Sequence, residues 1–139
     1  MKIIPSYQLL FKEWYGWKKI TLNGITIWYK GYLLNVSFEQ LIKSVVELDI
    51  NSQNVIEELE RIVSSMNGHY AFLIQGKNWI FATVDRIRSI PIAFWCGDKN
   101  VLISNHAPLI KQELNLTMSD INFVSAVEIA MSGYTFGNK

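Results

Sequence analysis

Residues 66–95 read MNGHYAFLIQGKNWIFATVDRIRSIPIAFW, and this stretch carries the strongest structural signal in the chain. It contains three runs rich in β-branched and aromatic residues, which predict strands at 68–75, 79–84 and 90–95. Turn-forming residues follow the first run at 76–78. Residues 70–74 (YAFLI) do not alternate with polar residues, so this strand is apolar on both faces. The sequence therefore predicts a sheet that is covered by other layers on both sides.

The regions on either side of this stretch add strands and helices. Asn23-Gly24 joins predicted strands at 18–22 and 25–29, because both residues tolerate the positive φ of a two-residue hairpin. Ser37 and Gln40 match a capping box for a helix that reaches Leu48. Helical spacing predicts a second helix over 52–63, a short helix after Pro108 and a helix over 119–131. A strand is predicted at 101–104, and residues 1–15 match no element clearly.

The order of these elements and the length predict one domain. The chain has 139 residues, which suits a single domain. Strands, two helices, strands and two helices follow one another. This order predicts an α+β domain over residues 1–139, in which two sheets pack together and helices lie outside.

Composition narrows the classes of function. Half of the residues are hydrophobic and 18% are charged, which excludes a disordered chain. The net charge of +1 gives no reason to expect a nucleic-acid partner, and no apolar run is long enough to predict a membrane span. The single cysteine, Cys96, rules out an intrachain disulfide, so a cytoplasmic location is expected. Among the five Trp residues, Trp14, Trp17 and Trp28 belong either to an interdomain face or to a large core.

Few residues in the sequence point to chemistry. His69, His106 and Cys96 lack the spacing of metal ligands, so no metal site is expected. No glycine-rich phosphate loop and no nucleophile elbow occurs, and no cofactor is expected in this domain. Asp85 and Arg86 are predicted to form a structural ion pair or to cap the turn before Pro91.

The stretch at 66–95 resembles the N-terminal class II glutamine amidotransferase domain of the asparagine synthetase family. Asn67-Gly68 with 70–72, then Asp85-Arg86, then Pro91-Ile92 match that family's motifs at the same spacing. Weaker likeness extends over residues 25–139 and includes a family-like motif at 29–35. The resemblance implies an N-terminal-nucleophile hydrolase fold, which is a four-layer αββα sandwich of two antiparallel sheets, here truncated or compact. It assigns structural roles to Asn67, Gly68, Asp85, Arg86 and Pro91.

Departures from the family pattern imply that glutaminase activity is lost. In active members the second residue is a cysteine, whose α-amino group acts as the base for its own thiolate. Here Lys2 occupies the nucleophile position, and no side chain elsewhere rebuilds that arrangement. The oxyanion region aligns with Lys30 and Gly31, so the family's asparagine is replaced. Arg88 stands where the family usually has glycine, and Asp49 is an uncertain match to the acidic residue that binds the substrate amine.

Three functions stay open. The first is a degenerate amidotransferase domain that acts as a scaffold for an ATP-dependent, amide-forming synthetase domain, expected to follow in the parent protein and to use ATP and Mg²⁺. The second is a stand-alone interaction module, as a homodimer. The third is an enzyme with an unrecognised site, which requires Lys30, Asp49, His69 and Asp85 to cluster.

Overall fold

The computed structural model describes residues 6–13, 16–49 and 52–132. These residues form an α+β fold with two sheets and four α-helices. The α+β class predicted from the order of the elements is therefore confirmed. Lys2, the residue at the predicted nucleophile position, lies outside the described residues.

The larger sheet has four antiparallel strands in the order β2 (Lys18–Leu22), β3 (Ile25–Leu33), β4 (Gly68–Gln75) and β5 (Ile80–Val84). The predicted hairpin joins β2 to β3, and Asn23 and Gly24 have φ values of 49° and 79°. In β4, Phe72 packs toward the helices and Leu73 toward the second sheet, and both are fully buried. The prediction that this strand is covered on both faces is confirmed.

Two helices cover one face of this sheet, α1 (Phe38–Val46) and α2 (Val55–Ser64). The predicted capping box begins α1: the backbone N–H of Gln40 donates to the Ser37 hydroxyl at 3.2 Å, and the N–H of Ser37 donates to Gln40 Oε1 at 3.0 Å. The apolar stripes of both helices bury Leu41, Val45 and Leu59 against the sheet. This layer holds most of the core.

The smaller sheet has the order β1 (Ser6–Leu10), β7 (Asn100–Ser104) and β6 (Ala93–Cys96). It is mixed, because β1 runs parallel to β7, so the prediction of two antiparallel sheets is wrong for this sheet. The sequence did not predict β1, since SYQLL shows no clear strand periodicity. Hydrogen bonds hold β1 against the end of β7. The Ser104 hydroxyl donates to the Leu10 carbonyl at 2.6 Å, and the Asn105 side chain bonds both the N–H and the carbonyl of Lys12.

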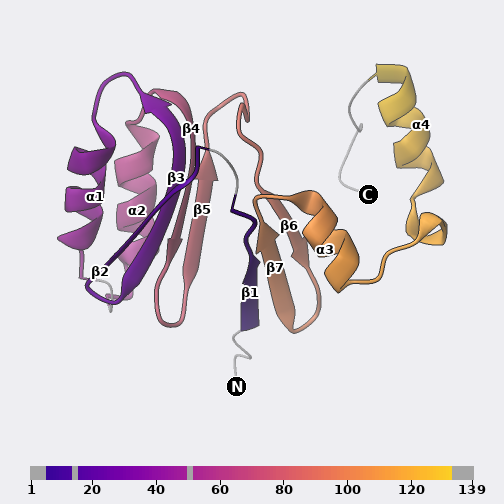
Figure 1. The fold of residues 1–139 in the computed structure, drawn as a ribbon, viewed down its shortest axis with the longest axis horizontal. Helices are drawn as coiled ribbons and strands as arrows, with labels where there is room; N and C mark the ends of the chain where they lie inside the picture. Colours follow the sequence, from indigo (N-terminus) through magenta and orange to yellow (C-terminus); the bar gives the residue numbers. More distant parts are fainter. Residues whose placement is uncertain (1–5, 14–15, 50–51, 133–139) are drawn as a thin grey trace.

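Figure 1 shows the helices α1 and α2, the four-stranded sheet, the three-stranded sheet and α3 (Ala107–Glu113) in succession across the molecule. Trp28 and Leu73 from one sheet meet Ile103 from the other in a buried cluster, against which Trp17 packs. Of the two alternatives for the Trp residues, the core is observed for Trp28, whereas Trp17 is partly buried against it. Trp14 lies outside the described residues.

The last helix, α4 (Phe123–Ser132), stands apart from these layers in Figure 1. It begins four residues later than the predicted Ser119, because Thr117 and Asp120 cap a separate 3₁₀ turn at Met118–Asp120. No residue of α4 is buried. Among the described residues, no helix is long and apolar enough to cross a membrane.

Candidate functional site

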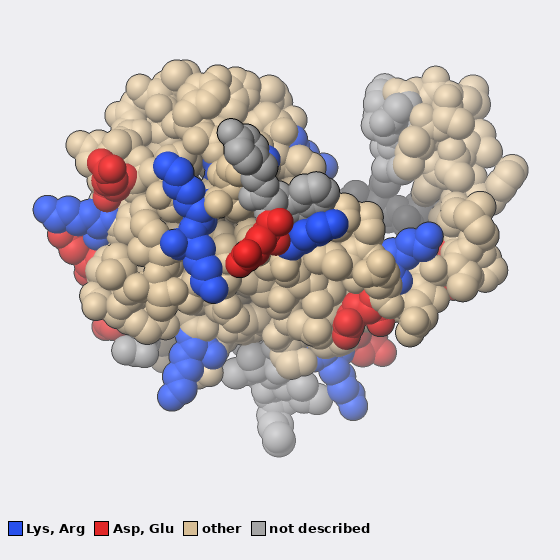
Figure 2. Space-filling model, viewed as in Figure 1, with Lys and Arg blue, Asp and Glu red and all other residues tan. Residues whose placement is uncertain are grey.

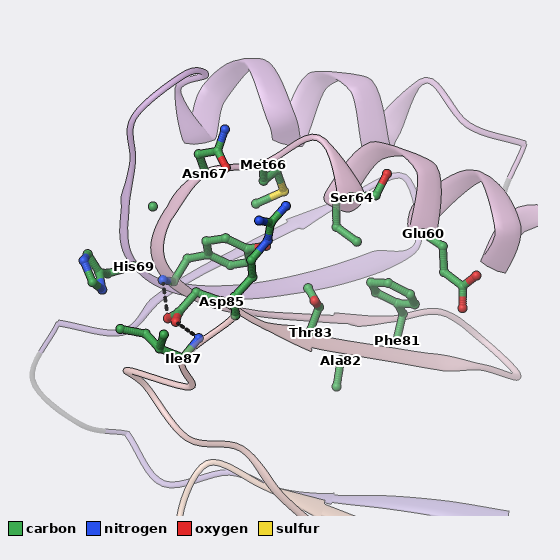
Figure 3. A pocket seen from close by; sticks show the side chains of 14 residues that line it. Glu60, Ser64, Met66, Asn67, His69, Phe81, Ala82, Thr83, Asp85 and Ile87 are labelled. Carbon is green, nitrogen blue, oxygen red and sulfur yellow. Dashed lines mark hydrogen bonds between the residues drawn. The ribbon is translucent and has the colours of Figure 1, made fainter.

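Asp85 follows β5 and is only 4% exposed. Its carboxylate accepts hydrogen bonds from three backbone N–H groups, those of Tyr70 at 3.1 Å, Ile87 at 3.0 Å and Ser89 at 3.2 Å. The Ser89 hydroxyl also donates to it. Figure 3 shows the carboxylate between the start of β4 and the turn that leads away from β5. One side chain thus ties the turn to the adjacent strand.

The backbone around Asp85 closes the same turn. The Asp85 N–H donates to the Tyr70 carbonyl at 2.9 Å, and the Arg88 N–H donates to the Asp85 carbonyl at 3.0 Å. Arg88 has a φ of 55°, a conformation that favours glycine. Of the two roles predicted for Asp85, capping the turn is the one observed, and among the described residues no ion pair joins Asp85 to Arg86.

Two opposing effects set the pKa of Asp85. Burial raises the pKa of this carboxyl because it disfavours the charged form. The hydrogen bonds from Ser89, Ile87 and Tyr70 favour the charged form, and together they hold the pKa below its ordinary value. Asp85 is therefore a stable carboxylate and has no tendency to act as a general acid near neutral pH.

Gly31 on β3 and Gly68 on β4 lie where the neighbouring strand leaves no room for a Cβ. Gly31 has a φ of 103°, and a Cβ there would lie 1.9 Å from the carbonyl oxygen of His69. Gly68 has a φ of 149°, and a Cβ there would lie 2.2 Å from the carbonyl oxygen of Tyr32. Both positions thus require glycine for a backbone reason. This accounts for Gly31 without an oxyanion role.

Asn67 connects β4 to the segment after β3. Its N–H donates to Asn35 Oδ1 at 2.9 Å, and its carbonyl accepts from the Leu34 N–H at 2.8 Å. Asn35 Nδ2 also donates to the Ser65 carbonyl at 2.7 Å. The sequence marks Asn35 only as the end of the family-like motif at 29–35, and it does not single out Ser89. An Asp followed by a polar residue four positions later in a turn is the available signal for Ser89.

The other predicted site residues are spread over the fold. Lys30 lies on β3, half-buried and opposite Ala71. Pro91 precedes β6, which begins at Ala93 and not at the predicted residue 90, and the neighbouring Ile92 packs between the sheets. Arg86 is exposed on the turn after β5.

A cavity of about 540 Å³ lies beside the edge of the larger sheet. Its walls are α2, the start of β4, strand β5 and the Asp85 turn, as Figure 3 shows. Its polar lining includes Glu60, Asn67, His69, Tyr70, Asp85 and Arg86, and its apolar lining includes Val63, Met66 and Phe81. Burial and the Asp85 charge raise the pKa of Tyr70, whereas the Arg86 charge opposes that rise.

This arrangement lacks the parts of a nucleophilic site. The Ser89 hydroxyl donates directly to Asp85, so no histidine stands between them as a base. The His69 ring packs at 5.3 Å from the Tyr32 ring. His69 and Asp85 line the cavity but Lys30 and Asp49 do not, so the cluster required by the third function is not assembled there. Among the described residues, no group of three acidic, histidine or cysteine side chains is placed to hold a metal.

Comparisons of this chain with family models, with curated proteins and with solved structures returned no match. The resemblance of residues 25–139 to an amidotransferase domain therefore stays a prediction. The function must be argued from the geometry of the fold and its surfaces.

Proposed function

We propose that this chain is an amidotransferase-like domain of the asparagine synthetase type that no longer hydrolyses glutamine and acts as a scaffold for an ATP-dependent, amide-forming synthetase domain. In this proposal the two sheets and their flanking helices are the four-layer αββα sandwich of an N-terminal-nucleophile hydrolase, with a mixed smaller sheet. The apolar surface of residues 116–131 carries the proposal of a partner domain.

The positions of the family-like motifs support this family. Asn67-Gly68 begins β4, Asp85 closes β5 and Pro91 leads into β6, so each motif stands at the end of a strand. Arg88 has a positive φ at the position where the family usually has glycine. Such a conformation is uncommon for a residue with a Cβ and is readily adopted by glycine, so it suits a position where the family usually has glycine.

One substitution in the oxyanion region supports the loss of glutamine hydrolysis. Lys30 replaces one donor of the oxyanion region, a change that typically costs on the order of a hundredfold or more in rate. The purified chain should release no ammonia from glutamine above the background rate.

The surface of residues 116–131 supports a partner domain. Its large apolar side chains are 38–83% exposed: Leu116, Met118, Ile121, Phe123, Val124, Val127, Ile129 and Met131. Within α4 most of them lie on one side of the helix, whereas Ser125, Glu128 and Ser132 recur at positions i, i+3 and i+7 and form a polar stripe. Figure 2 shows the α4 lobe, at the upper right, without a blue or red side chain on the face in view. An apolar helix face is normally buried, so we expect a partner that covers this face.

The chemistry of that partner follows from the proposed family. A synthetase domain activates a carboxylate with ATP and Mg²⁺, and an amine then attacks the activated group. Residues 1–139 lack the S-G-G-x-D-S loop that binds pyrophosphate in that domain, so the ligase step belongs to the partner, in cis or as a separate protein. A cytoplasmic location agrees with the single cysteine.

The size of the native gene product tests this proposal. An immunoblot of source cells with antibodies against this chain should detect a product several-fold heavier than 16.0 kDa. A product of about 16.0 kDa would instead favour the stand-alone homodimeric module, in which a second copy covers α4.

The heavier product is then assayed for ATP–pyrophosphate exchange with a panel of carboxylates. The double variant Val124→Asp, Ile129→Asp should lower that exchange, because it places two charges in the proposed interface. Leu34→Asp is the matched control, since Leu34 is also exposed (74%) but lies on the segment after β3. Equal exchange by both variants would contradict the proposed role of α4.

A further inference from the structure

Strand β5 forms an edge of the larger sheet, so no strand of this sheet pairs with its outer side. The N–H of Asp85 pairs with the carbonyl of Tyr70, and the N–H of Gly76 pairs with the carbonyl of Trp79. Because hydrogen-bonded positions alternate along an antiparallel pair, Phe81 and Thr83 bond to β4. The backbone groups at positions 80, 82 and 84 therefore point away from β4. Within the described part of the chain they have no backbone partner.

The two edge strands of this sheet differ in how well their composition prevents pairing with a strand of another chain. Strand β2 begins with Lys18 and Lys19, and charged side chains at an edge discourage pairing with another chain. Strand β5 reads IFATV, with no charged residue and no proline. Its composition suits the addition of a strand.

We propose that two copies of this chain associate through β5, as antiparallel edge strands related by a two-fold axis at Ala82. In this register Ile80 of one copy faces Val84 of the other, and Phe81 faces Thr83. The outward backbone groups of the two strands are then paired, and the two four-stranded sheets become one continuous sheet.

The cavity beside β5 supplies charge complementarity for this pairing. Glu60 lines it near Phe81, as Figure 3 shows, whereas Arg86 lies beyond the other end of β5. The two-fold axis reverses the direction of the second copy. It therefore brings the Glu60 end of each cavity to the Arg86 end of the other, and Arg86 has no ion-pair partner within the described part of its own chain.

This association is independent of the proposed function, because β5 and α4 are separate surfaces. A front domain of a ligase and a stand-alone module can both pair through β5. Dimerisation by itself therefore does not support either function.

A pair of proline variants tests the register. The mass of the wild-type chain, measured by light scattering during size exclusion at rising concentration, should approach twice 16.0 kDa. Ala82→Pro removes an outward N–H and should leave the fold intact but weaken the dimer at least tenfold. Thr83→Pro removes an N–H that bonds to β4 and should destabilise the fold itself. A wild-type chain that stays monomeric at every concentration, or an Ala82→Pro variant that still dimerises fully, would overturn the proposal.

A charge exchange tests the orientation without touching the strand. Glu60→Lys and Arg86→Glu should each weaken the dimer by about three- to fivefold, as for exposed ion pairs, and the double variant should recover most of this loss. Thermal melts establish that each variant is folded. Additive losses in the double variant would contradict the two-fold arrangement.

Discussion

Strand β4 and helix α4 are both rich in apolar residues, yet β4 is buried and α4 is exposed. All five residues at 70–74 of β4 are buried, because α1 and α2 cover one face of the sheet and the second sheet covers the other. Helix α4 has no buried residue, and Phe123 is 78% exposed. Apolar sequence therefore specifies that an element will be covered, but the surrounding layers determine whether the cover lies in the same domain.

This difference in burial implies that β4 contributes to folding stability, whereas α4 contributes to binding of a partner. A buried Leu or Phe in β4 contributes about 1.5–3 kcal/mol to folding, and this term belongs to the domain alone. The apolar side chains of α4 contribute little until a partner covers them. We therefore expect substitutions near β4 to change the free energy of unfolding, and substitutions in α4 to change association.

The largest expected effect is at the junction of β3 and β4. Gly31→Ala places a methyl group against the His69 carbonyl, and we expect a loss of about 3 kcal/mol in unfolding free energy from strain and lost pairing. Gly24→Ala is the control, because Gly24 also has a positive φ (79°) but no atom within 4 Å of the added carbon. It should cost about 1 kcal/mol. Urea unfolding measures both, and equal losses would contradict the close approach of the two strands.

The second prediction concerns two carboxylates, Asp85 next to the start of β4 and Asp120 in the turn before α4. Asp85→Asn turns one acceptor oxygen into a donor that faces backbone N–H groups, so the melting temperature should fall by roughly 5–10 °C. Asp85→Ala should also destabilise the fold, without changing the binding surfaces. Asp120→Asn should leave the melting temperature of the chain nearly unchanged, because the hydrogen bonds of Asp120 are confined to the exposed turn with Thr117. Differential scanning calorimetry compares these variants.

Acid should reveal the same contrast. The pKa of Asp85 is lower in the folded chain than the ordinary 3.8, so below that value the unfolded chain binds more protons. The stability from this carboxylate is present above pH 3.8 and is lost as the pH falls toward the folded pKa. Hydrogen bonds from Thr117 also lower the pKa of Asp120, but on a separate turn. Asp85→Asn should reduce the dependence of the unfolding free energy on pH in acid more than Asp120→Asn does. The reverse order would contradict the role of Asp85 in tying the turn after β5 to β4.

Smaller effects are expected from α4 in the chain alone. Val127→Asp should change the unfolding free energy by less than about 0.5 kcal/mol, as for an exposed site. Leu73→Val, in the apolar run of β4, should cost about 1 kcal/mol because it removes a buried methylene group between the sheets. A comparable loss of unfolding free energy from Val127→Asp would show that α4 packs against the two sheets in solution.

One substitution is expected to raise the stability of the chain. Arg88→Gly should raise the unfolding free energy by up to about 1 kcal/mol, since glycine adopts the observed φ of 55° without a Cβ penalty. Arg88→Ala should not give this gain, because alanine keeps the Cβ. Chemical denaturation of the two variants measures the difference, and a loss on Arg88→Gly would argue against strain at this turn.

Most of the elements could be predicted because their signals are local. The Asn23-Gly24 turn, the Ser37 capping box and the apolar run of β4 each depend on a few neighbouring residues. Strand β1 could not, because its pairing with β7 joins residues more than ninety positions apart, through Ser104 and Asn105. The mixed topology of the smaller sheet follows from that long-range contact.

The site was predictable only in part. The structural role of Asp85 could be inferred, but its partner Ser89 and the link from Asn35 to Asn67 depend on how loops meet in space. Of the Trp residues that the sequence offers for an interdomain face, Trp28 is buried in the core and Trp17 packs against the same cluster. The exposed apolar surface instead lies in residues 116–131, where helical spacing alone does not indicate whether a helix is covered.

Amide hydrogen exchange of residues 123–132, in the chain alone and in the full native gene product, distinguishes a docking helix from one that stays uncovered. The amides of α4 should exchange rapidly in the isolated chain, whereas those of β4 should be protected in both samples. In the full product we expect strong protection of α4 by its partner domain. Equally rapid exchange of α4 in both samples would contradict its role as the docking element.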